Sequence, residues 1–265
     1  MFSTGDLFVT TLYLLSSGPG DLAYLPPLAR HALAQSDHLV AYGLYLDLLG
    51  ELVANKQRHE LPLGEEIERA RLALNLAADG KNTALISSGD IGIYAMATLV
   101  FELLDKPEES SNNPKWQEVH IEVIAGISAI QALASRSGAP IAHDFCTISL
   151  SDLLTPWEVI EKRLHAAGAG DFVIAFYNPV SRKRQWQLEK AKQILLNYRP
   201  ENTPVILGKN LTRTDEIITH TSLSNLDIKQ VDMLTLVMVG NSESTRIETP
   251  QGQWVYTPRG YGQKL

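Results

Sequence analysis

The chain has 265 residues, of which 45% are hydrophobic and 20% charged, a composition typical of a soluble globular protein with ample sequence for a core. Its formal net charge of -7 argues against a general nucleic-acid binder, because such proteins carry a basic face. The single cysteine, Cys146, excludes an intramolecular disulfide, a zinc site built on cysteines and a protein-bound iron–sulfur cluster.

The sequence carries none of the common membrane or metal signals. No apolar run reaches the ~18 residues that a membrane span needs, and the start "MFSTGDLFVT" lacks the basic and apolar regions of a signal peptide. The seven histidines are scattered, with no HExxH pattern. We therefore expect a cytoplasmic protein that binds neither membrane nor nucleic acid and has no metal site.

The first half of the chain alternates strand-length apolar runs with helical patterns. A strand at 12–15 is followed by a helix that starts at Pro26 and Pro27, because proline costs no hydrogen bond in a first turn. The polar segment 106–118 is expected to be a surface loop. Such alternation is typical of βαβ units on a parallel sheet. The remaining predicted strands are 38–42, 83–87 and 119–125, and the helices are 65–79, 94–105 and 128–137.

The pattern restarts after a junction near residues 139–145. The last two strands are separated by too little chain for a crossover helix, which predicts an antiparallel ending. We therefore predict an α/β fold of two domains, 11–140 and 145–246, with a mostly parallel first sheet, a mixed second sheet and a ligand in the cleft between them. The predicted strands of this half are 146–151, 172–178, 204–210, 216–223 and 234–241, and the helices are 156–167 and 186–198.

Four loops at the carboxyl ends of predicted strands are candidates for ligand binding. In open α/β sheets ligands bind at these strand ends, where backbone amides are free. In the first loop, Gly18-Pro19-Gly20 either forms a plain tight turn or lets a ligand approach the backbone. With Ala23 it also fits a dinucleotide fingerprint, but no acidic residue ends the second strand to hold a ribose. The loops are 16–21, 87–97, 125–134 and 177–187.

Several charged or polar residues in these loops allow two interpretations. Asp90 could cap the next helix, but residues 91–93 separate it from that helix and favour a ligand contact. Ser128 is expected to be a helix N-cap, whatever else it does. The run 182–184, Arg-Lys-Arg, is either a solvated face or a polyanion site, since cations near a helix N-terminus oppose the helix dipole.

In this order the loops resemble those of the tetrapyrrole methylases, enzymes that use S-adenosylmethionine (SAM). "SSGPGD" resembles the family's GxGPGD turn, "SSGDIGIY" its GDPxxY loop and "AGISA" its PGxTA element. The block 143–164 is similar to the members that methylate C17 of a corrin precursor, and the likeness spans about residues 12–246. Ser17, Ile91 and Ala125 depart from the family's glycine and two prolines.

The resemblance implies transfer of a methyl group from SAM to C17 of precorrin-3B or cobalt-precorrin-3, with ring contraction, in a homodimeric enzyme of cobalamin biosynthesis. Whether the substrate carries cobalt stays open. Alternatives are a methylase of uroporphyrinogen III, of another corrin carbon, of ribosomal RNA or of a diphthine intermediate, and a non-catalytic tetrapyrrole or nucleotide carrier. The implied SAM contacts are Pro19, Ser88, Gly89, Asp90, Ile93, Ser128, Ala129, Asn178 and the backbone at Leu211.

Ring contraction involves a hydroxyl proton, so the resemblance also implies a general acid or base. Asp152 could equally cap the helix that follows Pro156. The substrate is a polycarboxylate, which suits guanidinium and ammonium groups. The acid–base candidates, which the sequence does not rank, are Asp21, His143, Asp144, Ser149 and Asp152, and the expected substrate contacts are Arg182, Lys183, Arg184, Arg213 and Arg246.

Overall fold

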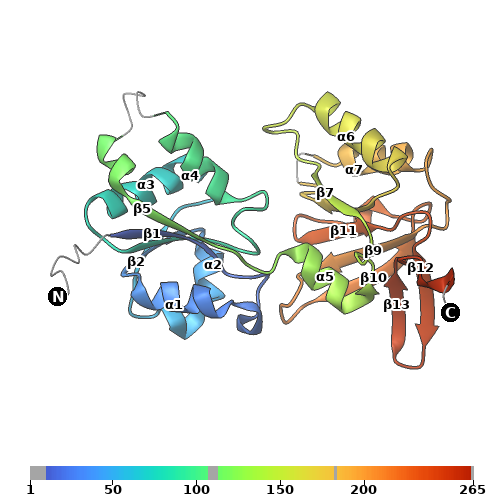
Figure 1. The fold of residues 1–265 in the computed structure, drawn as a ribbon, viewed down its shortest axis with the longest axis horizontal. Coiled ribbons are helices and arrows are strands. Elements are labelled where there is room, and N and C mark those ends of the chain that lie inside the picture. Colours follow the sequence, from blue (N-terminus) through green and yellow to red (C-terminus); the bar gives the residue numbers. More distant parts are fainter. Residues whose placement is uncertain (1–9, 107–112, 182–183, 264–265) are drawn as a thin grey trace. The chain divides into compact units, whose positions relative to one another are not determined.

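A computed structural model describes residues 10–106, 113–181 and 184–263 of the chain. The chain divides into two compact units, 1–128 and 129–265, each with its own sheet (Figure 1). Both are built from strands and helices, which confirms the predicted α/β class.

The first unit contains a five-stranded parallel sheet with the strand order β3-β2-β4-β1-β5. The central strands β1 and β4 are almost continuously apolar because both faces of the sheet are covered. The predicted strands are confirmed, whereas β3 had no apolar pattern to predict it. The strands are β1 (Thr11–Ser16), β2 (His38–Ala41), β3 (Gln57–Glu60), β4 (Thr83–Ser87) and β5 (His120–Ile124).

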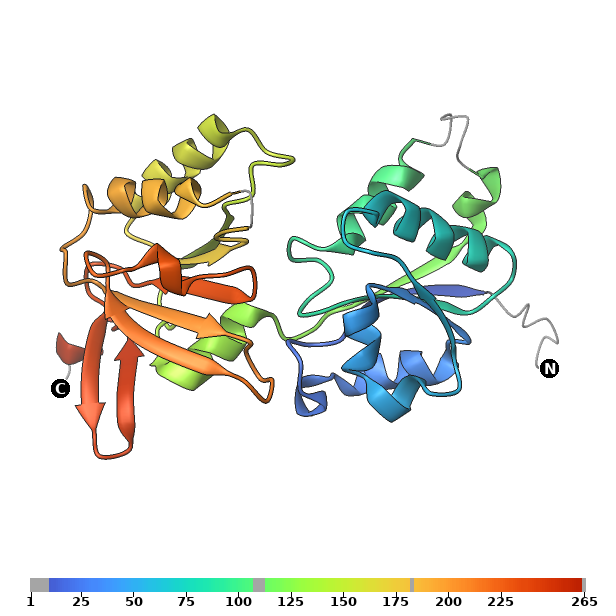
Figure 2. The ribbon, with the colours of Figure 1, turned by 180° about the vertical axis from the view of Figure 1, so that it is seen from behind.

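Helices cover both faces of this first sheet (Figures 1 and 2). On one face Leu12 and Leu14 pack with α3 and α4. On the other face Leu15 packs with α1 and α2. The helices are α1 (Pro27–Gln35), α2 (Gly43–Asp47), α3 (Glu66–Ala78) and α4 (Met96–Leu104), with short 3-10 turns at Leu22–Tyr24, Gly50–Val53 and Pro114–Glu118.

The second unit contains a mixed five-stranded sheet with the order β10-β9-β11-β8-β7. β7 and β8 are parallel, while β11 runs antiparallel to both β8 and β9, and β10 antiparallel to β9. The predicted antiparallel ending is correct only in that β10 and β11 are each antiparallel to β9. β9 lies between these last two strands, so they do not pair and run parallel to each other. The carboxyl ends of β7, β8 and β9 therefore share one edge. The strands are β7 (Phe145–Ser149), β8 (Val173–Tyr177), β9 (Pro204–Lys209), β10 (Ile217–Ser222) and β11 (Thr235–Val239).

Helix α5 (Ala129–Ser137) belongs to the second unit, so the division falls after Ser128 and differs from the predicted junction at 139–145. The physical reason is that the apolar side of α5, with Ile130 and Leu133, packs onto one face of the second sheet. The helices α6 (Trp157–Ala169) and α7 (Trp186–Leu195) cover its other face.

A C-terminal hairpin extends the second unit beyond the predicted end at residue 246. It consists of β12 (Thr245–Thr249) and β13 (Gly252–Tyr256), and β13 pairs in parallel with the short β6 (Gly138–Ala139). Short 3-10 turns lie at Ile228–Gln230 and Tyr261–Gln263. No helix among the described residues is long and apolar enough to cross a membrane.

Candidate active site

In the first unit the loop after β1 pairs with the loop after β4. Gly18 and Gly89 exchange backbone hydrogen bonds, from Gly18 N to Gly89 O at 3.2 Å and from Gly89 N to Gly18 O at 2.7 Å. Gly18 has φ +75°, and a Cβ on it would lie 2.8 Å from the carbonyl oxygen of Tyr24. This turn therefore needs glycine for the protein's own backbone, before any ligand is considered.

Asp90 joins the β4 loop to the loop after β5. Its Oδ1 accepts a hydrogen bond from Gly92 N and its Oδ2 one from Gly126 N, both at 2.8 Å. The next helix, α4, starts at Met96 without a side-chain cap, so Asp90 does not cap it. Each carboxylate oxygen keeps a further lone pair, and the predicted SAM contact of Asp90 stays a prediction.

Two residues that sequence reasoning left without a role complete the connection of the three loops. Ser16 Oγ accepts a hydrogen bond from Ile91 N at 2.8 Å. A Cβ on Gly126 would lie 2.4 Å from Ser16 Cβ and 2.5 Å from Gly89 O, so only glycine fits there. The glycine of "AGISA" was a signal for this close approach, but nothing local in the sequence indicated Ser16.

The structure brings the predicted SAM contacts of the first unit to one edge of its sheet. Pro19 is buried, and Ser88 donates from Oγ to Gly18 O at 3.3 Å. Ser128 is only 2% exposed, and its Cα and Oγ lie 3.9 Å from where a Cβ on Gly89 would be. Ile93 is half-buried and donates from its amide to Asp90 O.

Two further predicted residues follow Ser128 and Pro19 along the chain. Ala129 is the first residue of α5 and falls in the second unit. Asp21 is exposed and accepts a hydrogen bond from Ala23 N at 2.8 Å, which caps a 3-10 turn.

In the second unit Arg184 connects the loops after β7 and β8. Its Nη1 donates to Leu150 O at 3.1 Å and to Asn178 O at 3.4 Å. Asn178, which has φ +50°, donates from Nδ2 to Ser149 Oγ at 3.1 Å. The Arg184 side chain is 12% exposed, so it shapes the loops themselves, while Arg182 and Lys183 lie outside the described residues.

Asp152 belongs to the same cluster. Its Oδ2 accepts a hydrogen bond from Gln187 Nε2 at 3.0 Å, and its Oδ1 lies 3.9 Å from Arg184 Nε. The cap of α6 is Pro156, which makes no side-chain hydrogen bond. The expectation that Asp152 could cap this helix is therefore wrong, because α7 and the segment before it hold the carboxylate instead.

The loop after β9 contains two non-glycine residues in the left-handed region, Asn210 with φ +49° and Thr212 with φ +64°. Such residues cost about 1–3 kcal/mol each and persist where their surroundings hold them. Glu216 does so here, because its Oε2 accepts from Thr212 N at 2.5 Å and its Oε1 accepts from Arg136 Nε at 2.8 Å. The predicted contact Leu211 lies between them, 6% exposed.

The acid–base candidates do not form one cluster. His143 and Asp144 precede β7 and are exposed, whereas Ser149 ends the strand and Asp152 follows it. The five residues of β7 span about 16 Å, which separates the two pairs. The Asp144 amide donates to His143 Nδ1 at 2.7 Å, a contact within the turn itself. Ser149 and Asp152 therefore belong to the cluster of Asn178 and Arg184, whereas His143 and Asp144 lie at the other end of β7.

The remaining predicted substrate contacts lie on different elements. Arg213 follows the β9 loop directly, whereas Arg246 is an exposed residue of β12. Burial lowers the pKa of His220 on β10, and the positive charge of Arg246 lowers this pKa further. Arg246 is thus near His220 on β10, whereas Arg213 lies in the segment after β9.

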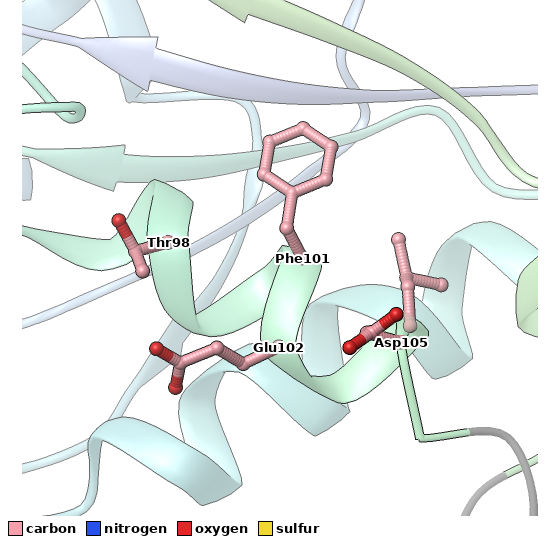
Figure 3. A pocket seen from close by; sticks show the side chains of 5 residues that line it. Thr98, Phe101, Glu102 and Asp105 are labelled. Carbon is pink, nitrogen blue, oxygen red and sulfur yellow. The ribbon is translucent and has the colours of Figure 1, made fainter.

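Among the described residues, neither a metal-binding cluster nor a surface hollow adds a further site. Within the described ranges no group of three or more His, Cys, Asp or Glu side chains is placed to hold a metal. A hollow on α4 contains none of the predicted site residues (Figure 3). Its lining residues are Thr98, Phe101, Glu102, Leu104 and Asp105.

Two α/β units with tightly connected loops at the carboxyl ends of their strands define the class, a two-domain α/β ligand-binding protein. Residues 11–227 match the model of the Tetrapyrrole (Corrin/Porphyrin) Methylases, and the chain belongs to this family. The match confirms the predicted family and its reaction class, methyl transfer.

Curated relatives are similar over nearly all of this chain. It is 44% identical over 253 residues to the Cobalt-factor III methyltransferase of Priestia megaterium, covering 96% of this chain and 45% of that protein. It is 42% identical over 254 residues to the Precorrin-3B C(17)-methyltransferase of Sinorhizobium sp, covering 95% and 97%. A Probable cobalt-factor III C(17)-methyltransferase of Salmonella typhimurium is 44% identical, covering 94% and 99%. The chain thus spans less than half of the first relative and nearly all of the other two.

Solved structures confirm the fold. The crystal structure of the methyltransferase CobJ matches with a TM-score of 0.86 and 34% identity, covering 94% of this chain and all of that one. A uroporphyrin-III C-methyl transferase from Thermus thermophilus matches with a TM-score of 0.62 and 20% identity, covering 87% and 97%, a likeness of fold alone.

Proposed function

We propose that the chain is a SAM-dependent C-methyltransferase of cobalamin biosynthesis that methylates C17 of a precorrin-3B-type ring, with ring contraction. The observation that carries the proposal is the 42% identity to a Precorrin-3B C(17)-methyltransferase over 95% of this chain and 97% of that one. The relatives' names include both metal-free and cobalt-containing substrates, so the proposal covers both.

The loops have features that suit SAM as the cofactor. Ile93 is half-buried, which leaves apolar surface for an adenine ring. Asn210 is 7% exposed, and within the described part of the chain its buried Oδ1 has no hydrogen-bond partner. A buried acceptor is costly without a donor, so this atom suits an N–H or O–H group of a cofactor.

Positioning is the main task that the protein has in the methyl transfer. SAM supplies a methyl group on a positively charged sulfur, which an electron-rich ring carbon attacks in line. Holding the reactants in line and in contact accounts for much of the rate of such a step. The three connected loops of the first unit and the Glu216-held loop of the second provide rigid backbone for this purpose.

For the ring contraction we favour Ser149 and Asp152 over the other acid–base candidates. Ser149 accepts a hydrogen bond from Asn178, a proposed cofactor contact. Asp152 lies 3.9 Å from the Nε of Arg184, which also donates to the carbonyl oxygen of Asn178. A hydroxyl and a carboxylate there could relay the hydroxyl proton of the substrate.

An anaerobic incubation with methyl-labelled SAM tests the proposal, with precorrin-3B and cobalt-factor III offered separately and uroporphyrinogen III as a third acceptor. We expect one labelled methyl group on one of the first two rings, with an absorption change from ring contraction. Labelling of uroporphyrinogen III alone would assign another tetrapyrrole methylase. Binding of S-adenosylhomocysteine (SAH) and of tetrapyrrole without any product would assign a carrier.

We further infer a homodimer in the cytoplasm that contacts no nucleic acid or membrane. The acidic net charge of -7 supports the absence of nucleic acid. Light scattering after size-exclusion chromatography measures the oligomeric state, and a monomer at micromolar concentration would contradict the dimer.

A further inference from the structure

Two adjacent leucines between β7 and α6 lie almost entirely in solvent. Leu153 is 78% exposed and Leu154 is 98% exposed. Single exposed apolar residues are common, but contiguous ones mark interaction sites. Trp186, at the start of α7, is 51% exposed, and its ring contacts that of Trp157, three positions after Leu154. We call Leu153, Leu154 and Trp186 the apolar rim.

The loop that carries the leucines is fixed at both ends. Before them, Leu150 donates from N to Tyr177 O at 2.9 Å, and Asp152 accepts from Gln187 at 3.0 Å. After them, the ring of Trp157 contacts that of Trp186 edge to face, with centroids 4.7 Å apart and an interplanar angle of 66°. Because both ends of the loop are held by these contacts, the exposed leucines between them present apolar surface in a fixed position for a partner.

The apolar rim lies at the edge of the second sheet that also carries the proposed cofactor contacts. Leu153 and Leu154 follow the carboxyl end of β7, while Asn178 and Leu211 follow the ends of β8 and β9 at the same edge. A ligand that receives a methyl group from the proposed cofactor site must reach this edge, which the apolar rim shares.

The chemistry of the rim suits one part of the proposed substrate. A tetrapyrrole has carboxylates around its periphery and a broad apolar ring face. Leucine and indole side chains cannot pair with carboxylates, but they pack well on a conjugated ring. We infer that Leu153 and Leu154 bind the ring face of the tetrapyrrole, an inference that rests on the proposed function.

A second copy of the chain is the less suitable occupant. A stable interface buries roughly 800 Å² on each partner, and two leucines with half an indole provide only part of that area. The experiment therefore includes the oligomeric state as an outcome.

The test is the double variant Leu153→Ser/Leu154→Ser, with Leu63→Ser as the matched control. Leu63 is 55% exposed in the first unit between β3 and α3. Cobalt-factor III and precorrin-3B are titrated under anaerobic conditions, with quenching of tryptophan fluorescence as the readout, and SAH is titrated by calorimetry. We expect the Kd for the tetrapyrrole to rise about 10-fold or more in the double variant, with the Kd for SAH and the Tm unchanged.

Leu153→Met/Leu154→Met should restore most of the tetrapyrrole affinity, since it keeps the apolar surface. Equal tetrapyrrole affinity of the wild type and the serine variant would overturn the inference and leave the proposed function intact. Equal losses of tetrapyrrole and SAH affinity, or a changed oligomeric state, would also overturn it. Failure of the wild type itself to bind either ring would overturn the proposed function and the inference together.

Discussion

At the scale of single residues, Gly126 lies at a position with no room for a side chain. A Cβ there would overlap Ser16 Cβ and the Gly89 carbonyl oxygen, which belong to two other loops. We predict that Gly126→Ala lowers stability by about 1–3 kcal/mol, as overpacking does, and abolishes measurable SAH binding because all three loops shift. Thermal unfolding and calorimetry measure both effects.

Gly262→Ala is the control for this prediction. Gly262 has no atom within 4 Å of an added Cβ and no positive φ, so the variant should match the wild type in both measurements. Normal SAH binding by Gly126→Ala would show that the arrangement of the three loops does not position the cofactor.

In the run 182–184, Arg184 should have a different role from Arg182 and Lys183. Arg184 holds Leu150 and Asn178, so Arg184→Gln should weaken both SAH and tetrapyrrole binding. Arg182→Gln/Lys183→Gln should weaken tetrapyrrole binding about 10-fold and leave the Kd for SAH within about two-fold, because we predict that these two side chains pair with substrate carboxylates and not with the cofactor. Titration of both ligands tests this, and identical patterns in the two variants would contradict it.

At the scale of elements, Glu216 connects the β9 loop to α5 and should act as a positioning residue. Glu216→Ala removes the carboxylate that accepts hydrogen bonds from Thr212 N and from Arg136 Nε. The expected cost is about 1 kcal/mol, or about 5-fold in the KM for SAM, with kcat changed less. Glu216→Gln keeps an oxygen that can accept from the Thr212 amide, so its KM for SAM should lie between those of the wild type and Glu216→Ala.

Glu248→Ala is the matched control, because Glu248 is an exposed residue that accepts from Gln253 in the β12–β13 hairpin. A Glu216→Ala enzyme with an unchanged KM for SAM, or equal effects from the control, would remove Glu216 from the proposed role.

The adjacent strands β2 and β3 are joined by a pair of histidines that should make the protein sensitive to acid. His38 Nδ1 lies 3.0 Å from His59 Nε2, a hydrogen bond that needs at least one neutral ring. Burial is the main cause that lowers the pKa of both rings, the charge of Lys81 lowers both further, and Asp37 opposes this for His38. The folded state therefore binds fewer protons than the unfolded state, and stability falls as the pH falls below about 6.5.

We predict that His38→Gln/His59→Gln loses less of its Tm than the wild type does between pH 7.5 and pH 5.5. The exposed His31 provides the control, and His31→Gln should follow the wild type. Parallel pH profiles for the double variant and the wild type would show that this pair does not couple folding to protons.

The sequence predicted the strands that have a clear apolar pattern. It did not predict the strands that lack one. β1, β4 and β11 are buried nearly throughout, so their apolar runs were visible. The edge strand β3 reads Gln-Arg-His-Glu and is mostly exposed, and β12 is also mostly exposed. Backbone pairing with a neighbour forms such strands, and pairing leaves no local pattern.

The candidate site was predictable where it depends on glycine motifs and hidden where it depends on distant contacts. The glycines of the first three loops were recognised from short motifs. In contrast, Ser16 reaches Ile91 over 75 positions, and Arg136 reaches Glu216 over 80. The suggested cap at Asp152 failed for the same reason, since its partner Gln187 lies 35 positions away. Local rules suggest capping, and tertiary contacts override them.

At the scale of the whole molecule, the proposed SAM contacts are divided between two units with separate cores. Pro19, Ser88 and Ser128 lie in the first unit, whereas Asn178 and Leu211 lie in the second. A ligand stabilises each unit that it contacts, by about 2.7 kcal/mol at 100 times its Kd. SAH should therefore slow hydrogen exchange in β4 and in β9 alike, and should raise the midpoint of urea unfolding for both.

Hydrogen exchange followed by mass spectrometry distinguishes the two units because it assigns protection to peptides. NAD at the same concentration is the control. No acidic residue ends β2, where a dinucleotide site needs one, so NAD should change hydrogen exchange in neither unit. Protection confined to peptides of one unit would mean that the contacts assigned to the other unit are wrong. Protection of peptides from both units that is lost in Gly126→Ala would support the prediction. It would mean that SAH binding depends on the connected loops of the first unit and on contacts from the second unit.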